Sequence, residues 1–135
     1  MGRIALALML IAAAPRMAAA QDACTLPGQT RMLVAELFFG RASPKGEVTE
    51  EQWRAFLREQ ATPRFPAGLT AFDAFGQWQD PATQKIGRER TKVLLIATDD
   101  TDAARQKIAD LAAVWRKKFA QKSVGIVTRD ECAAF

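Results

Sequence analysis

The proline-rich stretch over residues 62–69, Thr-Pro-Arg-Phe-Pro-Ala-Gly-Leu, constrains the fold more than any other part of the sequence. Proline lacks a backbone N–H and restricts the residue before it, so a helix cannot run through two prolines that flank Arg-Phe. Gly68 then permits a sharp turn, and the aromatic-rich run that follows has the composition of a strand. The stretch therefore predicts a helix that ends before Pro63 and a strand over residues 69–78.

Capping and periodicity predict the remaining elements. Thr49 is the expected N-cap of the first helix, and Gln52 completes a capping box with it. The apolar stripe of this helix, from Trp53 to Leu57, is typical of core packing rather than of a cofactor site. A second amphipathic helix follows Asp99–Asp102, with apolar residues three and four apart. The four expected strands span residues 31–39, 69–78, 88–97 and 123–128.

This order, β-α-β-β-α-β, predicts an α+β fold of the ferredoxin-like type. Its commonest right-handed arrangement is a four-stranded antiparallel sheet in the order 4-1-3-2, with both helices on one face. The end of the fourth strand then lies beside the start of the first, which brings Cys132 and Cys24 to the same end of the sheet. We therefore expect these two cysteines to form a disulfide, as an even pair does in an exported protein.

The first 20 residues have the pattern of a secretory signal peptide. Arg3 precedes an apolar run over residues 4–14, and Ala18–Ala20 is a small-residue cleavage signal. The alternative, a transmembrane anchor, needs about 20 apolar residues, and Pro15-Arg16 interrupts the run. We predict cleavage after Ala20, a periplasmic or secreted location and no stable membrane insertion. The parts of the chain are then the signal peptide (1–20), a lead-in segment tethered by Cys24 (21–30) and a single α+β domain (31–135).

Composition excludes several classes of protein. The chain has no histidine and no tyrosine, which rules out Ser-His-Asp and Cys-His catalysis and His-ligated zinc or haem. Two thiols without histidine make a poor metal site, so we expect neither metal nor cofactor. Gln21 stands where a lipobox needs a Leu-like residue, which argues against a lipoprotein at Cys24. Without the signal peptide, acidic and basic residues nearly balance and form no basic stripe, so nucleic acid is not an expected partner.

The two faces of the first expected strand differ. One side is wholly apolar and should lie under the helices, which turns the other side outward. By parity, the expected outward residues are Met32, Val34, Glu36 and Phe38 on the first strand and Arg90, Lys92, Leu94 and Ile96 on the third, with Val93, Leu95 and Ala97 under the helices. Monomers seldom expose so many large apolar residues, so we expect this face to form a homodimer or to hold a small apolar or anionic ligand.

Glu36 among apolar neighbours is the best candidate for a carboxyl group with a perturbed pKa. Lys92 or Arg90 could lie near it, and the alternative is a cross-strand ion pair that only satisfies the carboxylate. Arg64, between its prolines, could bind an anion or cap the carbonyls at the end of the first helix. Trp78 is either an aromatic at the rim of the site or a core residue. The candidate catalytic residues are Glu36, Arg64 and Lys92, and the candidate ligand-binding residues are Glu36, Phe38, Arg64, Trp78, Arg90 and Lys92.

Several of these segments resemble a bacterial family of exported proteins that is known only as a domain of unknown function (DUF3574). The resemblance rests on Glu36-Leu37-Phe38-Phe39-Gly40, on the proline-rich stretch and on Gly76-Gln77-Trp78, and it covers residues 31–135. The family implies no activity, substrate or cofactor.

The sequence therefore leaves two hypotheses. The first is a non-enzymatic exported module that self-associates and binds a small ligand on its open sheet face. The alternative is a small cofactor-independent enzyme of the dimeric α+β barrel type. It would use Glu36 as general base and Arg64 or Lys92 to stabilise an anion.

Overall fold

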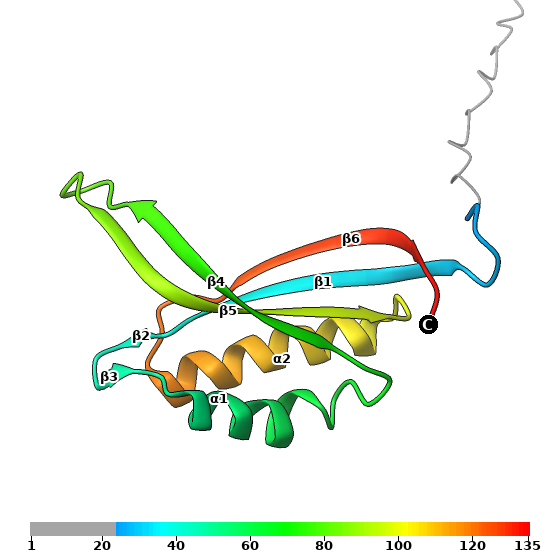
Figure 1. The fold of residues 1–135 in the computed structure, drawn as a ribbon, viewed down its shortest axis with the longest axis horizontal. Helices are drawn as coiled ribbons and strands as arrows, with labels where there is room; N and C mark the ends of the chain where they lie inside the picture. Colours follow the sequence, from blue (N-terminus) through cyan, green and yellow to red (C-terminus); the bar gives the residue numbers. More distant parts are fainter. Residues whose placement is uncertain (1–23) are drawn as a thin grey trace, which may run out of the picture.

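A computed structural model describes residues 24–135. The predicted signal peptide and its cleavage site lie outside these residues. Four long strands form one twisted layer, and the helical segments pack against one of its faces (Figure 1). The strands are β1 (Thr30–Gly40), β2 (Ala42–Ser43), β3 (Gly46–Glu47), β4 (Thr70–Gln79), β5 (Ile86–Thr98) and β6 (Gly125–Ala133), and the helical segments are α1 (Glu50–Phe56), the π-helical η1 (Leu57–Ala61) and α2 (Asp102–Phe119).

The long strands form an antiparallel sheet in the order β4-β5-β1-β6. This numbering differs from the order 4-1-3-2 written from the sequence because the expected loop over residues 40–46 contains the β2–β3 hairpin, which shifts the number of every later strand. Counted over the four long strands alone, each strand has its expected neighbours, with β1 between β5 and β6. Two-residue strands carry no periodicity, so the sequence could not distinguish this hairpin from a loop.

The first helix begins as predicted. The Thr49 hydroxyl accepts a hydrogen bond from the Gln52 N–H at 3.2 Å, and the Gln52 side chain accepts one from the Thr49 N–H at 2.9 Å. The helix widens into the π turns of η1 and ends at Ala61, two residues before Pro63. Gly68 has φ +141°, a conformation that residues with a Cβ rarely adopt, and the chain enters β4 two residues later.

The core lies between the sheet and the helices. Every second residue of β1 from Leu33 to Phe39 is no more than 1% exposed, which confirms the predicted apolar side of this strand. The Trp115 side chain on α2 is fully buried among aromatic rings. Its ring centroid lies 5.0 Å from that of Phe39, 4.9 Å from that of Phe56 and 4.4 Å from that of Phe119. Offset and edge contacts of this kind add to the stabilisation from burial alone.

The predicted faces of β5 are wrong. Leu94 pairs with Leu37 and Lys92 pairs with Phe39, and directly paired residues of an antiparallel sheet share a face. Arg90, Lys92, Leu94 and Ile96 therefore lie on the helix side, whereas Val93, Leu95 and Ala97 lie on the opposite side. The parity expected for this strand was off by one residue, and an error of one residue exchanges the two faces of a strand.

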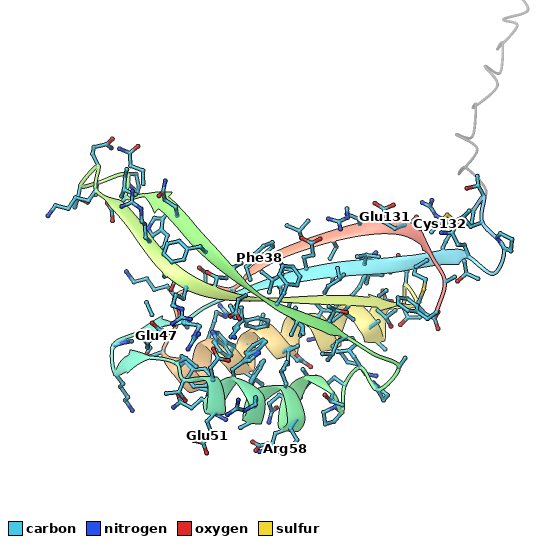
Figure 2. The ribbon with its side chains drawn as sticks, viewed as in Figure 1. Phe38, Glu47, Glu51, Arg58, Glu131 and Cys132 are labelled. Carbon is cyan, nitrogen blue, oxygen red and sulfur yellow. A yellow bond between two sulfur atoms is a disulfide. The ribbon has the colours of Figure 1, made fainter. Side chains whose placement is uncertain are left out.

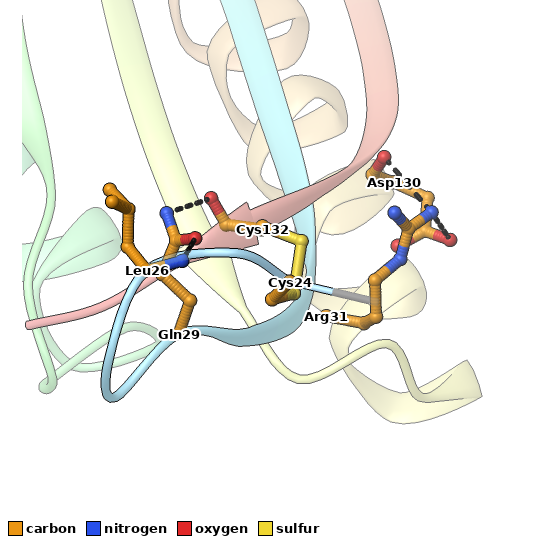
Figure 3. The surroundings of a disulfide bond; sticks show 6 residues. All are labelled: Cys24, Leu26, Gln29, Arg31, Asp130 and Cys132. Carbon is orange, nitrogen blue, oxygen red and sulfur yellow. Dashed lines mark hydrogen bonds and ion pairs between the residues drawn. A yellow bond between two sulfur atoms is a disulfide. The ribbon is translucent and has the colours of Figure 1, made fainter. Parts of the chain in front are cut away.

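The structure confirms the disulfide between Cys24 and Cys132, whose Cα atoms are 5.5 Å apart. It joins the start of β1 to the end of β6 (Figure 3). The Gln29 side chain donates to the Cys132 carbonyl at 3.3 Å, and Arg31 forms an ion pair with Asp130 at 2.6 Å. A disulfide fits a periplasmic or extracellular protein. Within residues 24–135, no helix has the length and apolar character needed to cross a bilayer.

The buried tryptophan generates a stability prediction. Trp115→Ala should lower the free energy of unfolding by about 3–5 kcal/mol, because it leaves a cavity where the aromatic rings meet. Urea denaturation followed by circular dichroism measures this loss. The matched control is Trp78→Ala on the sheet hairpin, where the indole is 49% exposed and the loss should stay below about 1.5 kcal/mol. Equal losses at the two positions would contradict the assigned core.

Candidate functional site

The side of the sheet away from the helices carries no second layer among residues 24–135, and we call it the open face (Figure 1). The register of the four long strands assigns its side chains. The larger apolar residues on it are Met32, Val34, Phe38, Phe72, Val93, Leu95 and Val127. Phe72 is 49% exposed and Val127 is 45% exposed, so a substantial apolar surface faces outward.

Glu36 lies on the open face and forms an ion pair with Arg129 of β6. The Arg129 Nη2 atom donates to Glu36 Oε1 at 2.7 Å, and its Nε lies 3.6 Å from a Glu131 carboxylate oxygen. This hydrogen bond to Glu36 raises the pKa of Arg129. Phe38 and Glu131 extend from the same side of the sheet (Figure 2). The cross-strand ion pair considered as an alternative is therefore present, but its cation is Arg129 rather than Lys92 or Arg90.

Lys92 belongs to a separate charge cluster on the helix side. Its side chain is about 6% exposed, and its Nζ lies 2.9 Å from Glu50 Oε2 and 2.5 Å from Asp73 Oδ1. Arg41, also buried, donates to the other Glu50 oxygen at 2.7 Å and to the Val48 carbonyl at 2.8 Å. Buried cations are tolerated only when such partners satisfy them. We call this group the Lys92 cluster, and it joins β5, β4 and the start of α1.

The electrostatics of the Lys92 cluster keep its members charged. Burial alone lowers the pKa of Lys92, but the hydrogen bonds to Asp73 and Glu50 outweigh it and the pKa is raised. The hydrogen bond from Lys92 lowers the pKa of Glu50 and that of Asp73. The Lys92 cluster therefore links β5, β4 and the start of α1 through charge-assisted hydrogen bonds.

Arg90 and Arg64 also lie away from Glu36 and its ion pair. The Arg90 guanidinium is on the helix side of β5, with Nη1 3.7 Å from a Glu47 oxygen. Arg64 Nη1 donates to the Gln60 carbonyl at 2.8 Å and to the Gln60 side-chain oxygen at 3.1 Å. This geometry matches the interpretation of Arg64 as a residue that caps the end of the helical segment.

Trp78 lies on the part of the β4–β5 hairpin that projects beyond the rest of the sheet (Figure 1). The indole is 49% exposed, so its assignment to the core is wrong. It covers Gly87 of the opposite strand, where an added Cβ would come within 2.6 Å of the ring. Of the sequence candidates, Glu36 and Phe38 lie close together on the open face, and Trp78 lies on the same side of β4 but on the projecting part of the hairpin.

The sequence missed the residue that matters most to Glu36. The expected fourth strand ends at residue 128 and so does not include Arg129, whereas β6 continues to Ala133. The expected Cys24–Cys132 bond was the signal that this strand continues toward residue 132. In the observed register Cys132 pairs with Arg31, which places Arg129 opposite Val34, two residues from Glu36. Arg41, Glu50 and Asp73 carried no comparable signal, since only the folded chain brings them to Lys92. Residues 24–135 contain no cluster of three acidic or cysteine ligands suited to a metal ion.

Comparison with known proteins gives a family and a fold. Residues 34–135 match the profile of a family described as "Protein of unknown function (DUF3574)". No curated protein sequence matches the chain. Among solved structures, a phage SAM lyase in complex with S-methyl-5'-thioadenosine is similar at 14% identity and a TM-score of 0.60, covering 76% of this chain and 87% of that one. The phage SAM lyase in its apo state is similar at 15% identity and a TM-score of 0.60, covering 84% and 94%. At this identity, the likeness concerns the fold alone.

The Lys92 cluster generates a pH prediction. The lowered pKa values of Glu50 and Asp73 mean that their contribution to stability is present above their ordinary pKa values of 4.5 and 3.8 and is lost as the pH falls through the folded-state values. Lys92→Met removes the hydrogen bonds that lower these values. The urea midpoint of this variant should therefore fall less than that of the parent chain between about pH 6 and about pH 3.

The control is Lys107→Met, which removes an exposed lysine from α2 and should keep the acid sensitivity of the parent chain. If Lys92→Met lost as much stability in acid as the parent, the assigned coupling would be wrong.

Proposed function

Because this chain belongs to the DUF3574 family, whose description states no function, we propose its function from its geometry: an exported module that self-associates through the open face and binds a small ligand there. We assign its α+β architecture to the ferredoxin-like type, on the strength of the β-α-β-β-α-β order and of the helices on one face. The likeness of fold to the phage SAM lyase is compatible with this assignment.

One observation carries the proposal. The open face exposes Phe72 and Val127 on its two outer strands, and Arg129 forms ion pairs with Glu36 and Glu131 among its apolar residues. Apolar surface of this kind is stabilised when a second surface covers it, at about 25 cal/mol for each Å² of apolar area removed from water. Arg129 pairs with both carboxylates within the chain, so covering the open face would not bury a charge that lacks a partner.

A second copy of the chain fits this surface. In a two-fold symmetric dimer, each copy contributes the same patch, so the surface has to be complementary to itself. The open face meets this requirement because its larger side chains are apolar and its opposite charges lie side by side. Export is supported by the leader pattern of residues 1–20 and by the disulfide, which persists in oxidising compartments.

Substitutions at two neighbouring residues of β6 test self-association through the open face. Val127→Glu places a charge on the open face and should shift the sedimenting species to the monomer, because the carboxylate would lose its hydration in the interface. Ile126→Glu is the matched control. Ile126 is 42% exposed and Val127 is 45% exposed, but Ile126 lies on the opposite side of the strand, so this variant should keep the mass of the parent. A monomeric parent chain at about 100 µM would overturn self-association.

The second candidate is a small cofactor-independent enzyme with Glu36 as general base. The likeness of fold to the phage SAM lyase favours testing it with one substrate, SAM. Under this hypothesis, the protein consumes SAM, Glu36→Gln loses at least about 100-fold in rate, and Glu131→Gln on the same face retains it. Chromatography of the reaction mixture measures the consumption. No consumption by the parent chain would exclude SAM, and equal rates in all three proteins would exclude Glu36 as the base.

A further inference from the structure

A hollow of about 530 Å³ lies at the disulfide end of the open face. Its floor is the end of the sheet, where Met32, Leu95 and Ala97 present their side chains on the open face. One wall is the loop over residues 67–69, which enters β4, and the other is formed by Ala133 at the end of β6 and by Ala134 and Phe135 after it. Pockets that bind small molecules have volumes of about 300–1,000 Å³, so this hollow is of a suitable size.

The chemistry of the hollow is uniform. None of the side chains that line it is ionisable, and the polar side chains among them are the hydroxyls of Thr30 and Thr70. The small residues along it include Gly28, Gly68 and Ala97. Their short or absent side chains leave this space open. Such a lining removes a neutral, apolar molecule from water without leaving a charge unpaired.

Two turns and the disulfide shape the hollow. Gly68 has φ +141° and Gly28 has φ +79°, conformations that shape the turns at the two rims. The Cys24–Cys132 bond ties the segment that carries Gly28 to the end of β6, where Ala133 lines the hollow (Figure 3). The disulfide therefore joins two of the segments that line the hollow, and walls that are already ordered spare the ligand the cost of ordering them.

We infer that this hollow binds a neutral, largely apolar small molecule with one or two hydrogen-bonding groups, which the hydroxyls of Thr30 and Thr70 receive. This inference rests on the binding role proposed for the open face and selects between the apolar and the anionic ligand. It also places the ligand at the disulfide end of the open face, away from Glu36.

The cations considered for an anionic ligand are already engaged elsewhere. Arg129 is paired with Glu36, Lys92 with Glu50 and Asp73 on the helix side, and Arg64 with Gln60. None of these cations lines the hollow. An anion in the hollow would lose its hydration and gain no positive partner from the lining side chains, which makes its binding unfavourable.

Two fluorescent probes that share one aromatic skeleton test the inference on the disulfide-bonded protein. N-phenyl-1-naphthylamine is neutral, and 8-anilino-1-naphthalenesulfonate carries one added sulfonate. The neutral probe should bind saturably, with one molecule per chain and at least about tenfold tighter than the sulfonate. Equal or tighter binding of the sulfonate would overturn the neutral class of ligand.

Variants locate the bound probe. Ala97→Phe fills the floor of the hollow and should weaken binding of the neutral probe by at least about tenfold. The matched control is Ala74→Phe, the same change on the open face of β4 outside the hollow, which should bind the probe as the parent does. Circular dichroism establishes that both variants fold. If Ala97→Phe failed to fold, Thr70→Phe at the β4 rim would take its place. Unchanged binding in the folded, filled variant would overturn the inference.

Sedimentation of the same samples separates this inference from self-association. A monomer that binds the neutral probe in the hollow would refute self-association and leave the inference standing. An oligomer that binds no probe until Val127→Glu makes it monomeric would mean that a second copy occupies the hollow, and this result would overturn the inference while supporting self-association.

Discussion

The packing of one side of β1 against the helices is the interaction on which the rest of the structure depends. Leu33, Ala35, Leu37 and Phe39 are almost completely excluded from water, and Phe39 contacts the aromatic rings around Trp115. Because β1 is an inner strand that pairs with both β5 and β6, its orientation decides which face every paired residue of those strands occupies. The open face is the direct consequence, since all the side chains that β1 does not turn toward the helices have to lie there.

This division separates the charges of the chain into two groups with different roles. On the helix side, Lys92 and Arg41 are buried, and the half-exposed carboxylate of Glu50 at the start of α1 pairs with both of them. On the open face, Glu36 and Arg129 are partly exposed, and each is the other's partner in an ion pair. The Lys92 cluster thus stabilises the packing of the helices on the sheet, whereas the open face remains an apolar surface with little net charge.

Much of the architecture could be predicted because local chemistry determined it. The helical segment begins at the capping box of Thr49 and ends before the prolines, as expected. The disulfide between Cys24 and Cys132 is consistent with the expected pairing of the first and last long strands. Register is different, because it depends on contacts between distant strands. Parity along the third expected strand placed Lys92 on the open face, but the side chain is buried on the helix side, where Glu50 and Asp73 pair with it, and neither partner is adjacent in sequence.

The candidate site was predictable only in part, for the same reason. The alternation of β1 was sufficient to place Glu36 and Phe38 on the open face. Arg129 can be recognised as the partner of Glu36 only when the full length of β6 is known. The hollow can be recognised only when the segments on either side of the sheet end are placed in space, and these appear in the sequence only as a loop and a tail.

The central claim is that the open face is covered in solution by a second copy. Hydroxyl-radical footprinting with mass spectrometry tests it most directly, with Phe72 as the probe of the open face and Phe75 as an internal reference. Phe75 is 68% exposed and lies on the other side of β4. The account predicts that Phe72 oxidation falls by at least about threefold relative to Phe75 as the protein concentration rises from about 0.1 to about 100 µM. A ratio that stayed constant over this range would contradict it.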